Sequence, residues 1–211
     1  WADYIYLDTD ERRRFAQVSH EYLIEQLQYP TEGSSKAKVK LNFNHPVKEL
    51  VWTMTDATSA AAGTTAVDAT ANSGGADATN GNDWFNYHCM TGTTSEVVNG
   101  QTSNEAFSTF KLQLNGHDRF SEREGRYFNL VQPYQHHENV PATGINVYSF
   151  GLKPEEHQPS GTCNMSRIDS ATLHLTLFSG VSSTPGKVRV YATNYNVLRI
   201  LSGMGGLAYS N

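Results

Sequence analysis

The stretch TLHLTL at residues 172–177 alternates leucine with threonine or histidine. Successive side chains of a β-strand point to opposite faces of the sheet, so the three leucines share one face and the polar residues share the other. The same alternation recurs in KVKLNF at residues 38–43, FKLQL at residues 110–114 and VRVYAT at residues 188–193. Each run therefore predicts a strand with one buried and one solvated face, as in antiparallel sheets.

Three further segments favour strands because they are rich in β-branched or aromatic residues. They are YIYL at residues 4–7, EYLIEQLQ at residues 21–28 and INVYSFGL at residues 145–152. The second also suits a helix by propensity, but the surrounding β pattern favours a strand. Helix is scarce, and the candidate is residues 11–17, because a threonine and an aspartate at positions 9–10 offer an N-cap.

Chain length and composition limit the architecture. With 211 residues, 38% hydrophobic and 18% charged, the chain is long enough to bury a core, and we expect a single domain over residues 1–211. About eight short strands, two long connections and little helix predict an all-β fold, an eight-stranded jelly-roll sandwich with long inserted apical loops. A two-sheet sandwich of another topology fits the same pattern. Because a strand-like run follows Trp1 at once, we expect the chain to begin within a longer protein.

Two connections interrupt the strand pattern. Residues 55–104 are rich in small and polar residues that bury too little apolar area to offset the cost of ordering the backbone, so they predict a variable surface loop. This loop contains an aromatic island, in which Trp84, Phe85 and Tyr87 are candidates for an anchor to its own domain or to a neighbouring subunit. Residues 132–143, rich in proline and histidine, predict a second exposed connection. The candidate glycosylation sites of the first loop are Asn72, Asn80 and Asn82.

Charge and cysteine usage exclude some classes of partner. A net charge of −5, with the basic residues clustered only at 12–14, disfavours a nucleic-acid surface, which needs many grouped Lys and Arg. No run of about 18 apolar residues is present, so we expect no insertion into a membrane. Cys89 and Cys163 stand far apart without the spacing of a zinc site, which favours two buried, reduced thiols and leaves a disulfide open.

No catalytic motif is complete. His136 and His137 are adjacent, and adjacent residues of a strand point to opposite faces, so they do not readily share one ion. The acids Asp118, Glu122 and Glu124 lie among Arg119 and Arg123, which favours an ion-paired turn over a pair of glycosidase carboxylates. The sequon NMS begins at Asn164 near a strand start, which favours a buried asparagine. We therefore expect no cofactor, no metal and no catalytic residue.

The glycines near the end of the chain suggest two different roles. Gly203, Gly205 and Ala208 spell the G-x-G-x-x-A of a dinucleotide-binding loop. That loop works only where a helix follows, because the helix N-terminus holds the pyrophosphate, and three residues after Ala208 leave no room for one. The favoured role is packing, since Gly203, Gly205 and Gly206 permit positive φ and close backbone approach where the last strand turns and ends.

Five blocks of sequence, taken together, resemble a known family. They are LDTDERRRFAQVSHEYLIEQLQ (7–28), LNFNHPVKELVW (41–52), LQLNGHDRF (112–120), QPSGTCNMSRIDSATL (158–173) and NYNVLRILSGMGGLAYSN (194–211). In the same order, they resemble the second jelly roll of major capsid proteins from the nucleocytoplasmic large DNA viruses. The resemblance spans nearly the whole chain and stops only in the 55–104 loop, where such proteins vary.

The resemblance implies a structural protein and not an enzyme. It implies subunits of two jelly rolls, of which three form a pseudo-hexagonal capsomer in an icosahedral shell. For this chain it implies the C-terminal roll, with a homotrimer, neighbouring capsomers, minor capsid proteins and the N-terminal jelly roll of the same polypeptide as partners. It also implies a place in the virion capsid shell, with assembly in the host cell cytoplasm.

Two other functions fit the same class of fold. A lectin-like sandwich would bind carbohydrate through Trp84, Tyr87 and the loop asparagines. A cupin-like metalloenzyme would hold a metal ion. Glycan binding would identify the first, and stoichiometric bound metal would identify the second.

Overall fold

Two antiparallel sheets form the fold of the chain. The computed structural model describes residues 1–29, 33–34, 38–55, 87, 96–98, 101–103, 107–177 and 187–210. The larger sheet has its main strands in the order β1 (His20–Gln28), β13 (Lys187–Leu201), β4 (Pro46–Thr55) and β10 (Asn146–Ser149). Short strands extend it, with β2 (Gly33–Ser34) and β14 (Met204–Leu207) pairing with β13, and β11 (Cys163–Asn164) pairing with β4.

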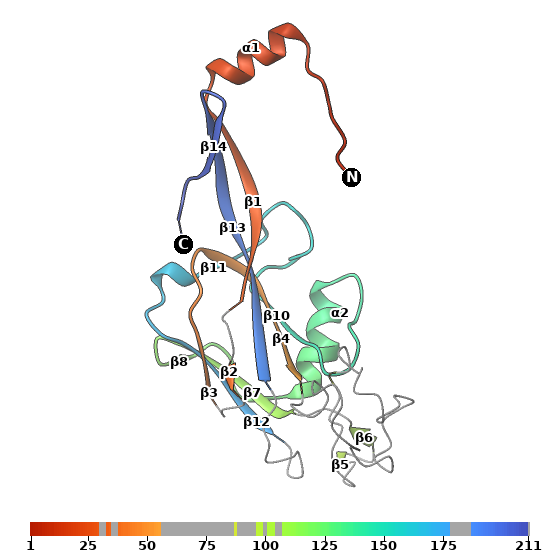
Figure 1. Ribbon diagram of the computed structural model, residues 1–211. Helices are drawn as coiled ribbons and strands as arrows, with labels where there is room; N and C mark the ends of the chain where they lie inside the picture. The colour runs from red at the N-terminus through yellow and green to blue at the C-terminus, as the bar shows by residue number, and fades with distance from the viewer. Residues whose placement is uncertain are drawn as a thin grey trace, which may run out of the picture.

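The smaller sheet lies across from the larger one (Figure 1). Its order is β3 (Lys38–Leu41), β12 (Ala171–Leu177), β7 (Phe107–Leu114) and β8 (His117–Asp118), and β9 (Arg123–Glu124) also pairs with β7. A separate two-stranded ladder joins β5 (Glu96–Val98) and β6 (Gln101–Ser103). Every pairing is antiparallel, as the alternation in the sequence predicted.

The strand order is that of a jelly roll. If β8 and β9 count as one interrupted strand, the eight main strands follow the order 1, 8, 3, 6 in the larger sheet and 2, 7, 4, 5 in the smaller one. Most consecutive strands thus alternate between the sheets, as in a double-sheet jelly roll with Greek-key connections. The predicted all-β jelly-roll class is confirmed.

An aromatic cluster joins the two sheets. Leu173 of the TLHLTL run is buried and Thr176 is exposed, so the alternation identified the inner face. Trp52 of β4 meets Phe110 of β7 edge-on, with ring centroids 5.1 Å apart, and both lie 5.4 Å from the ring of Phe128. Because each such ring removes about 150–250 Å² from water, this cluster holds the sheets together.

Helical segments lie outside the sheets. They are α1 (Thr9–Gln17), η1 (Tyr127–Val131), α2 (Gln132–His136) and η2 (Met165–Arg167). The predicted helix at 11–17 is confirmed, but its cap is Asp8, whose Oδ1 accepts a hydrogen bond from the Thr9 N–H at 2.8 Å. The prediction of a plain connection over residues 132–143 is wrong at its start, which is helical. No described helix is long and apolar enough to cross a bilayer.

Other local predictions need correction. Residues 4–7 lie outside both sheets and are exposed, although their pattern predicted a strand. Asn164 is exposed and not buried, because its Oδ1 accepts the N–H of Ser166 (3.1 Å) and so caps η2. The carboxylate of Asp118 is held by Lys111 (3.6 Å) and Gln113 (2.7 Å), and that of Glu122 accepts the Thr109 hydroxyl, in place of the expected arginine partners.

One part of the larger sheet projects from the body of the molecule. Figure 1 shows β1 and β13 running past the other strands, with β14 beside them and α1 at the far end. We call α1, β1, β14 and residues 196–201 of β13 the arm. The segment before α1 lies apart from the two sheets in this view.

Candidate interaction surface

Exposed apolar side chains gather in two places. Most of the large apolar side chains that are exposed in the described chain belong to the arm and its neighbouring segments: Trp1, Tyr4, Ile5, Tyr6, Leu7, Val18, Tyr22, Leu23, Leu27, Tyr29, Leu201, Met204, Leu207 and Tyr209. The others lie around α2: Leu130, Val131, Tyr134, Val140 and Leu152. We call this second group the α2 patch. Groups of exposed apolar side chains are candidate sites of interaction with other protein surfaces.

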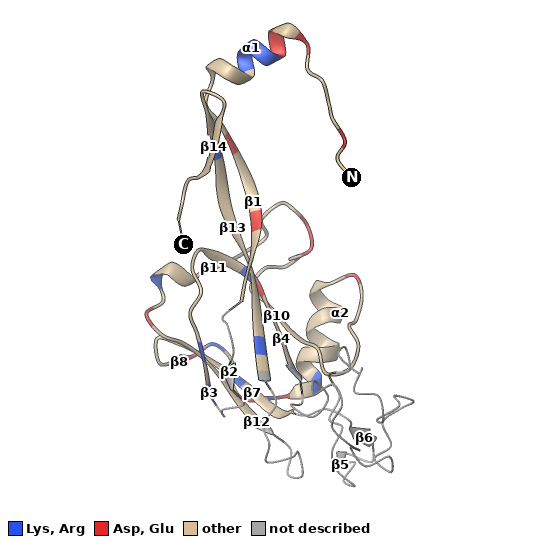
Figure 2. Ribbon diagram, in the orientation of Figure 1, with Lys and Arg blue, Asp and Glu red and all other residues tan. Residues whose placement is uncertain are grey.

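The arm exposes apolar residues on both of its faces. On one face, Tyr22 of β1, Leu198 of β13 and Leu207 of β14 stand directly opposite one another. The other face carries Leu23, and also Met204, which is paired with Leu201. Figure 2 shows that most of the arm's strand residues are uncharged, whereas α1 carries both acidic and basic residues. A sheet with two apolar faces needs a cover on each side, so the arm is built to contact other protein surfaces.

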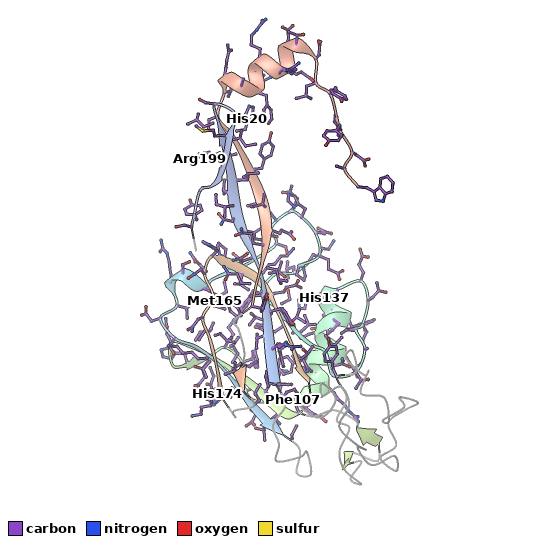
Figure 3. All side chains as sticks on the ribbon, in the orientation of Figure 1. His20, Phe107, His137, Met165, His174 and Arg199 are labelled. Carbon is purple, nitrogen blue, oxygen red and sulfur yellow. The ribbon has the colours of Figure 1, made fainter. Side chains whose placement is uncertain are left out.

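Polar contacts hold the three strands of the arm together. Arg199 donates to Oε1 of Glu21 through both Nε (2.9 Å) and an Nη (2.7 Å), near the tip of the arm, where Figure 3 labels Arg199. The buried Asn196 donates through Nδ2 to Oε1 of Gln26 and to the carbonyl oxygen of Tyr209, both at 2.9 Å. The segment after β14 is thereby fastened to β1 across the arm.

An ion pair between a nearly buried lysine and a partly exposed glutamate ties the base of the arm to the body. Nζ of Lys48, in β4, lies 2.7 Å from Oε1 of Glu25, in β1, and the Lys48 side chain is only 4% exposed. The same ammonium group lies 5.5 Å from the ring centroid of Tyr195, which lies opposite Glu25. Burial raises the pKa of Tyr195, so its hydroxyl stays neutral beside this pair. His157 adds a more distant contact to Glu25 at 3.9 Å.

Of the predicted packing glycines, Gly203 alone has positive φ. Ser202 (φ 53°) and Gly203 (φ 77°) form the tight turn between β13 and β14, and two positive φ values are typical of a primed hairpin turn. Gly205 and Gly206 lie in β14 with room for a side chain, since a Cβ at Gly205 would come no closer than 4.0 Å to Ile200 and Leu198. Within the described chain, the close approach expected of Gly205 and Gly206 does not occur.

The α2 patch is fixed to the edge of the larger sheet by its polar neighbours. The N–H of Ser149 in β10 donates to Oε1 of Gln132 (3.3 Å), and Nε2 of His137 lies 2.9 Å from Oε2 of Glu49 in β4. Nδ2 of Asn129 donates to the carbonyl oxygens of Ala142 and Ile145. The apolar side chains of the patch therefore project from a rigid base. No pattern in the sequence indicates this patch, because QPYQHH at residues 132–137 lacks an apolar period.

The predicted loop anchor is described at one position. Tyr87 is half-buried, and its backbone carbonyl lies so close to Gly144 that a Cβ on that glycine would collide with it. Here the loop touches its own roll. Trp84 and Phe85 lie outside the described residues, as do Asn72, Asn80, Asn82 and Cys89.

The structure carries no further sign of a reactive centre where it is described. Cys163 is a free, partly buried thiol, and burial raises its pKa, which lowers its reactivity. Among the described His, Cys, Asp and Glu side chains, no group of three or more could hold a metal ion. The histidines considered for a metal, His136 and His137, instead contact the carbonyl oxygen of Leu152 and the carboxylate of Glu49.

Comparison with known proteins identifies the family. The model of the large eukaryotic DNA virus major capsid protein family matches residues 11–206. The major capsid protein of Pyramimonas orientalis virus is 51% identical and is covered over 48% of its length, and that of Paramecium bursaria Chlorella virus 1 is 46% identical and is covered over 53%; each comparison covers 100% of this chain. The chain thus spans about half the length of these curated relatives.

Solved structures agree with the sequence comparison. A chain of the PBCV-1 virus capsid model matches with a TM-score of 0.73 and 41% identity, over 99% of this chain and 56% of that one. The Faustovirus major capsid protein, at 17% identity and a TM-score of 0.59 over 88% of this chain and 34% of that one, shares the fold. The names of the relatives favour a structural protein over the lectin-like and metalloenzyme alternatives, and the expected resemblance is confirmed. This chain, with its jelly-roll strand order and its match from Glu11 to Gly206, belongs to the major capsid protein family of the large eukaryotic DNA viruses.

Proposed function

We propose that this chain is one jelly roll of a capsid subunit, and that three subunits assemble into a capsomer of an icosahedral virion shell. Membership of the capsid protein family supports the structural role. The observation that carries the proposal is the arm, because both of its faces present apolar side chains that the described chain leaves uncovered. Folded proteins cover such surfaces by contact with other chains or domains.

The positions of the two apolar surfaces suit a closed ring. Subunits related by a three-fold axis contact each other through two different patches, one on each side of the interface. The arm projects past one end of the larger sheet, whereas the α2 patch flanks β10, its opposite edge strand (Figure 1). One copy can therefore contact one neighbouring copy through its α2 patch and the other neighbouring copy through a different surface.

The remaining partners in this proposal follow from the same role. They are a second jelly roll of the same polypeptide, neighbouring capsomers and minor capsid proteins, with assembly in the host cell cytoplasm. The length of the relatives supports a second roll, since this chain covers about half of each. In this proposal the 55–104 loop lies at the surface of the capsomer, and its sequence varies between members of the family.

Light scattering of the full-length protein tests the proposal. We expect a mass of three subunits at micromolar concentration. A monomer under those conditions would contradict the trimer. Electron microscopy of the same sample would show whether the particles have the hexagonal outline of a capsomer.

A further inference from the structure

The turn between β7 and β8 is formed by Asn115 and Gly116. Their φ values are 51° and 81°, so both residues adopt the left-handed conformation. Two such residues between the paired Leu114 and His117 are typical of a type I′ hairpin turn, for which asparagine followed by glycine is a preferred sequence. Both residues are exposed to solvent. The hairpin therefore places at the surface an asparagine whose side-chain amide is followed directly by an unhindered backbone nitrogen.

This arrangement supports one spontaneous reaction, deamidation. The backbone nitrogen of Gly116 loses its proton and attacks Cγ of Asn115, which forms an N–Cγ bond. The Cγ–Nδ2 bond then breaks, Nδ2 leaves as ammonia, and a succinimide ring remains. Water, the co-reactant, opens this ring. Opening at Cγ gives aspartate, and opening at the backbone carbonyl carbon gives isoaspartate, in which the main chain runs through Cβ and Cγ.

The nucleophile of this reaction is accessible. A Cβ placed on Gly116 would meet no atom within 4 Å, so no group beyond its chain neighbours crowds the residue. Among the residues that the structure describes, the Gly116 N–H has no hydrogen-bond acceptor. A proton that no protein group holds can be lost to water, so the nitrogen is free to react.

Ser170 acts on the other partner of the reaction. Its N–H donates to Oδ1 of Asn115 at 3.1 Å, and its carbonyl oxygen accepts the backbone N–H of Asn115 at 2.7 Å. Attack at Cγ moves negative charge onto Oδ1, the atom that the Ser170 N–H contacts. A backbone N–H aimed at such a developing charge stabilises the transition state. The second hydrogen bond fixes the backbone of Asn115, so the donor stays beside Oδ1 while the fold is intact.

We propose that Asn115 is a site of intramolecular deamidation in the folded protein. The Gly116 nitrogen is the nucleophile, and the Ser170 N–H is the donor that stabilises the negative charge on Oδ1. This modification is independent of the capsomer proposal, because it needs no contact with another chain.

Deamidation changes the charge and the geometry of the hairpin. Both products bring a carboxylate to the turn, close in sequence to the carboxylate of Asp118, which lies 3.6 Å from Nζ of Lys111. The isoaspartate product also lengthens the main chain at the turn and so disturbs the pairing of Leu114 with His117. Because β8 lies at the edge of the smaller sheet, the other strands keep their partners. The expected product is a folded protein with a loosened β7–β8 hairpin.

Mass spectrometry of the full-length protein tests the site. Trypsin releases the turn as the peptide 112–119, because Lys111 and Arg119 provide its two cleavage sites. Conversion replaces an amino group by a hydroxyl group and so raises the mass of this peptide, and chromatography separates the aspartate and isoaspartate forms. We expect conversion to be at least as fast in the native protein as in the same protein unfolded in guanidinium chloride, because unfolding removes the Ser170 donor. Slower conversion in the native protein would overturn the proposal.

Two substitutions separate the nucleophile from the donor. Gly116→Ala places a methyl group beside the attacking nitrogen and should slow conversion about tenfold or more. Ser170→Pro removes the N–H, keeps the carbonyl acceptor, and should slow conversion about threefold. Conversion at the wild-type rate in either variant would contradict the role given to that residue. If Ser170→Pro does not fold, the native and unfolded wild-type samples still measure the contribution of the donor.

Asn115→Gln is the matched control. It keeps a side-chain amide, but its additional methylene group requires a larger ring, so we expect the peptide 112–119 to remain unconverted. Conversion of this variant would assign the reaction to Gln113, the other amide of the peptide, and would refute the proposal.

Discussion

At the scale of single residues, Gly144 shows how the roll and its long loop are joined. Gly144 has φ +88°, and a Cβ there would collide with the backbone carbonyl of Tyr87. Gly116 has a similar φ of +81° but nothing within 4 Å of its Cβ position. The two glycines therefore share a left-handed backbone conformation, which glycine adopts without strain, and differ in what surrounds them.

This pair gives a matched prediction. Gly116→Ala should cost about 1–2 kcal/mol of unfolding free energy, the price of a left-handed conformation for alanine. Gly144→Ala should cost at least about 2 kcal/mol more, because the added methyl group also displaces Tyr87. Urea unfolding of both variants measures the difference. Equal losses would mean that Tyr87 does not press on the roll at this point.

His174, in the run that defines the fold, gives a prediction about pH. Burial, followed by the charges of Lys38 and Lys111, lowers its pKa below the ordinary 6.5, and its Nε2 lies 2.8 Å from Oε1 of Gln113. Between the lowered pKa and 6.5 the unfolded chain binds more protons than the folded chain. The free energy of unfolding therefore rises as the pH is raised through that window and decreases as the pH is lowered through it.

His174→Gln removes this group while leaving a polar side chain. We expect the free energy of unfolding of the variant to depend less steeply on pH just below pH 6.5 than that of the wild type. Urea titrations at several pH values measure the slopes. Identical slopes in the two proteins would show that His174 does not contribute.

At the scale of elements, the Lys48–Glu25 pair decides how firmly β1 is held to β4. Lys48 is nearly buried, so the loss of its partner leaves an ammonium group with little compensation. Glu25→Gln should therefore cost about 3 kcal/mol, whereas Lys48→Met, which removes the buried charge, should cost about 1 kcal/mol or less. Chemical denaturation distinguishes the two, and the double variant should resemble Lys48→Met. A larger loss from Lys48→Met than from Glu25→Gln would contradict this account.

The elements also show what the sequence could predict. The alternation of apolar and polar residues located the strands, because successive side chains of a half-buried strand are alternately buried and exposed. In β12, for example, Leu173 is buried and Thr176 is exposed. It missed α2 because that helix continues from η1, whose buried Phe128 and Asn129 dock it, and carries no apolar period of its own. It gave no sign that Lys48 is buried or that it pairs with Glu25, because β1 comes within reach of β4 only through β13, which lies between them in the sheet.

A strand pattern also records only a local preference. Residues 4–7 have the composition of a strand, but a strand needs a hydrogen-bonded neighbour, and the described chain supplies none to them. Strand β1 of the arm differs from residues 4–7 in this respect, because it pairs with β13 over nine residue pairs. Pairing partners are set by the whole fold, which is why the family resemblance was needed to choose the jelly roll over another sandwich.

At the scale of the whole molecule, one region stabilises the fold and other regions carry the exposed surfaces for contact with other chains. The aromatic cluster of Trp52, Phe110 and Phe128 makes the sandwich a stable block, whereas the arm and the α2 patch carry the exposed apolar area. A substitution at an exposed apolar residue of the arm or of the α2 patch should therefore alter assembly without altering the stability of the fold.

Tyr134 tests this division. It lies in α2 and is 82% exposed, so Tyr134→Glu should change the melting temperature of the full-length protein by less than about 2 °C. In the trimer the same carboxylate would be buried at an interface, and we expect at least about tenfold weaker assembly by light scattering, since about 1.4 kcal/mol is enough for that change. Tyr134→Phe keeps the ring and should assemble as the wild type does. Normal assembly of Tyr134→Glu would place the α2 patch outside the trimer contacts, and a large loss of stability would mean that the patch belongs to the core of the fold.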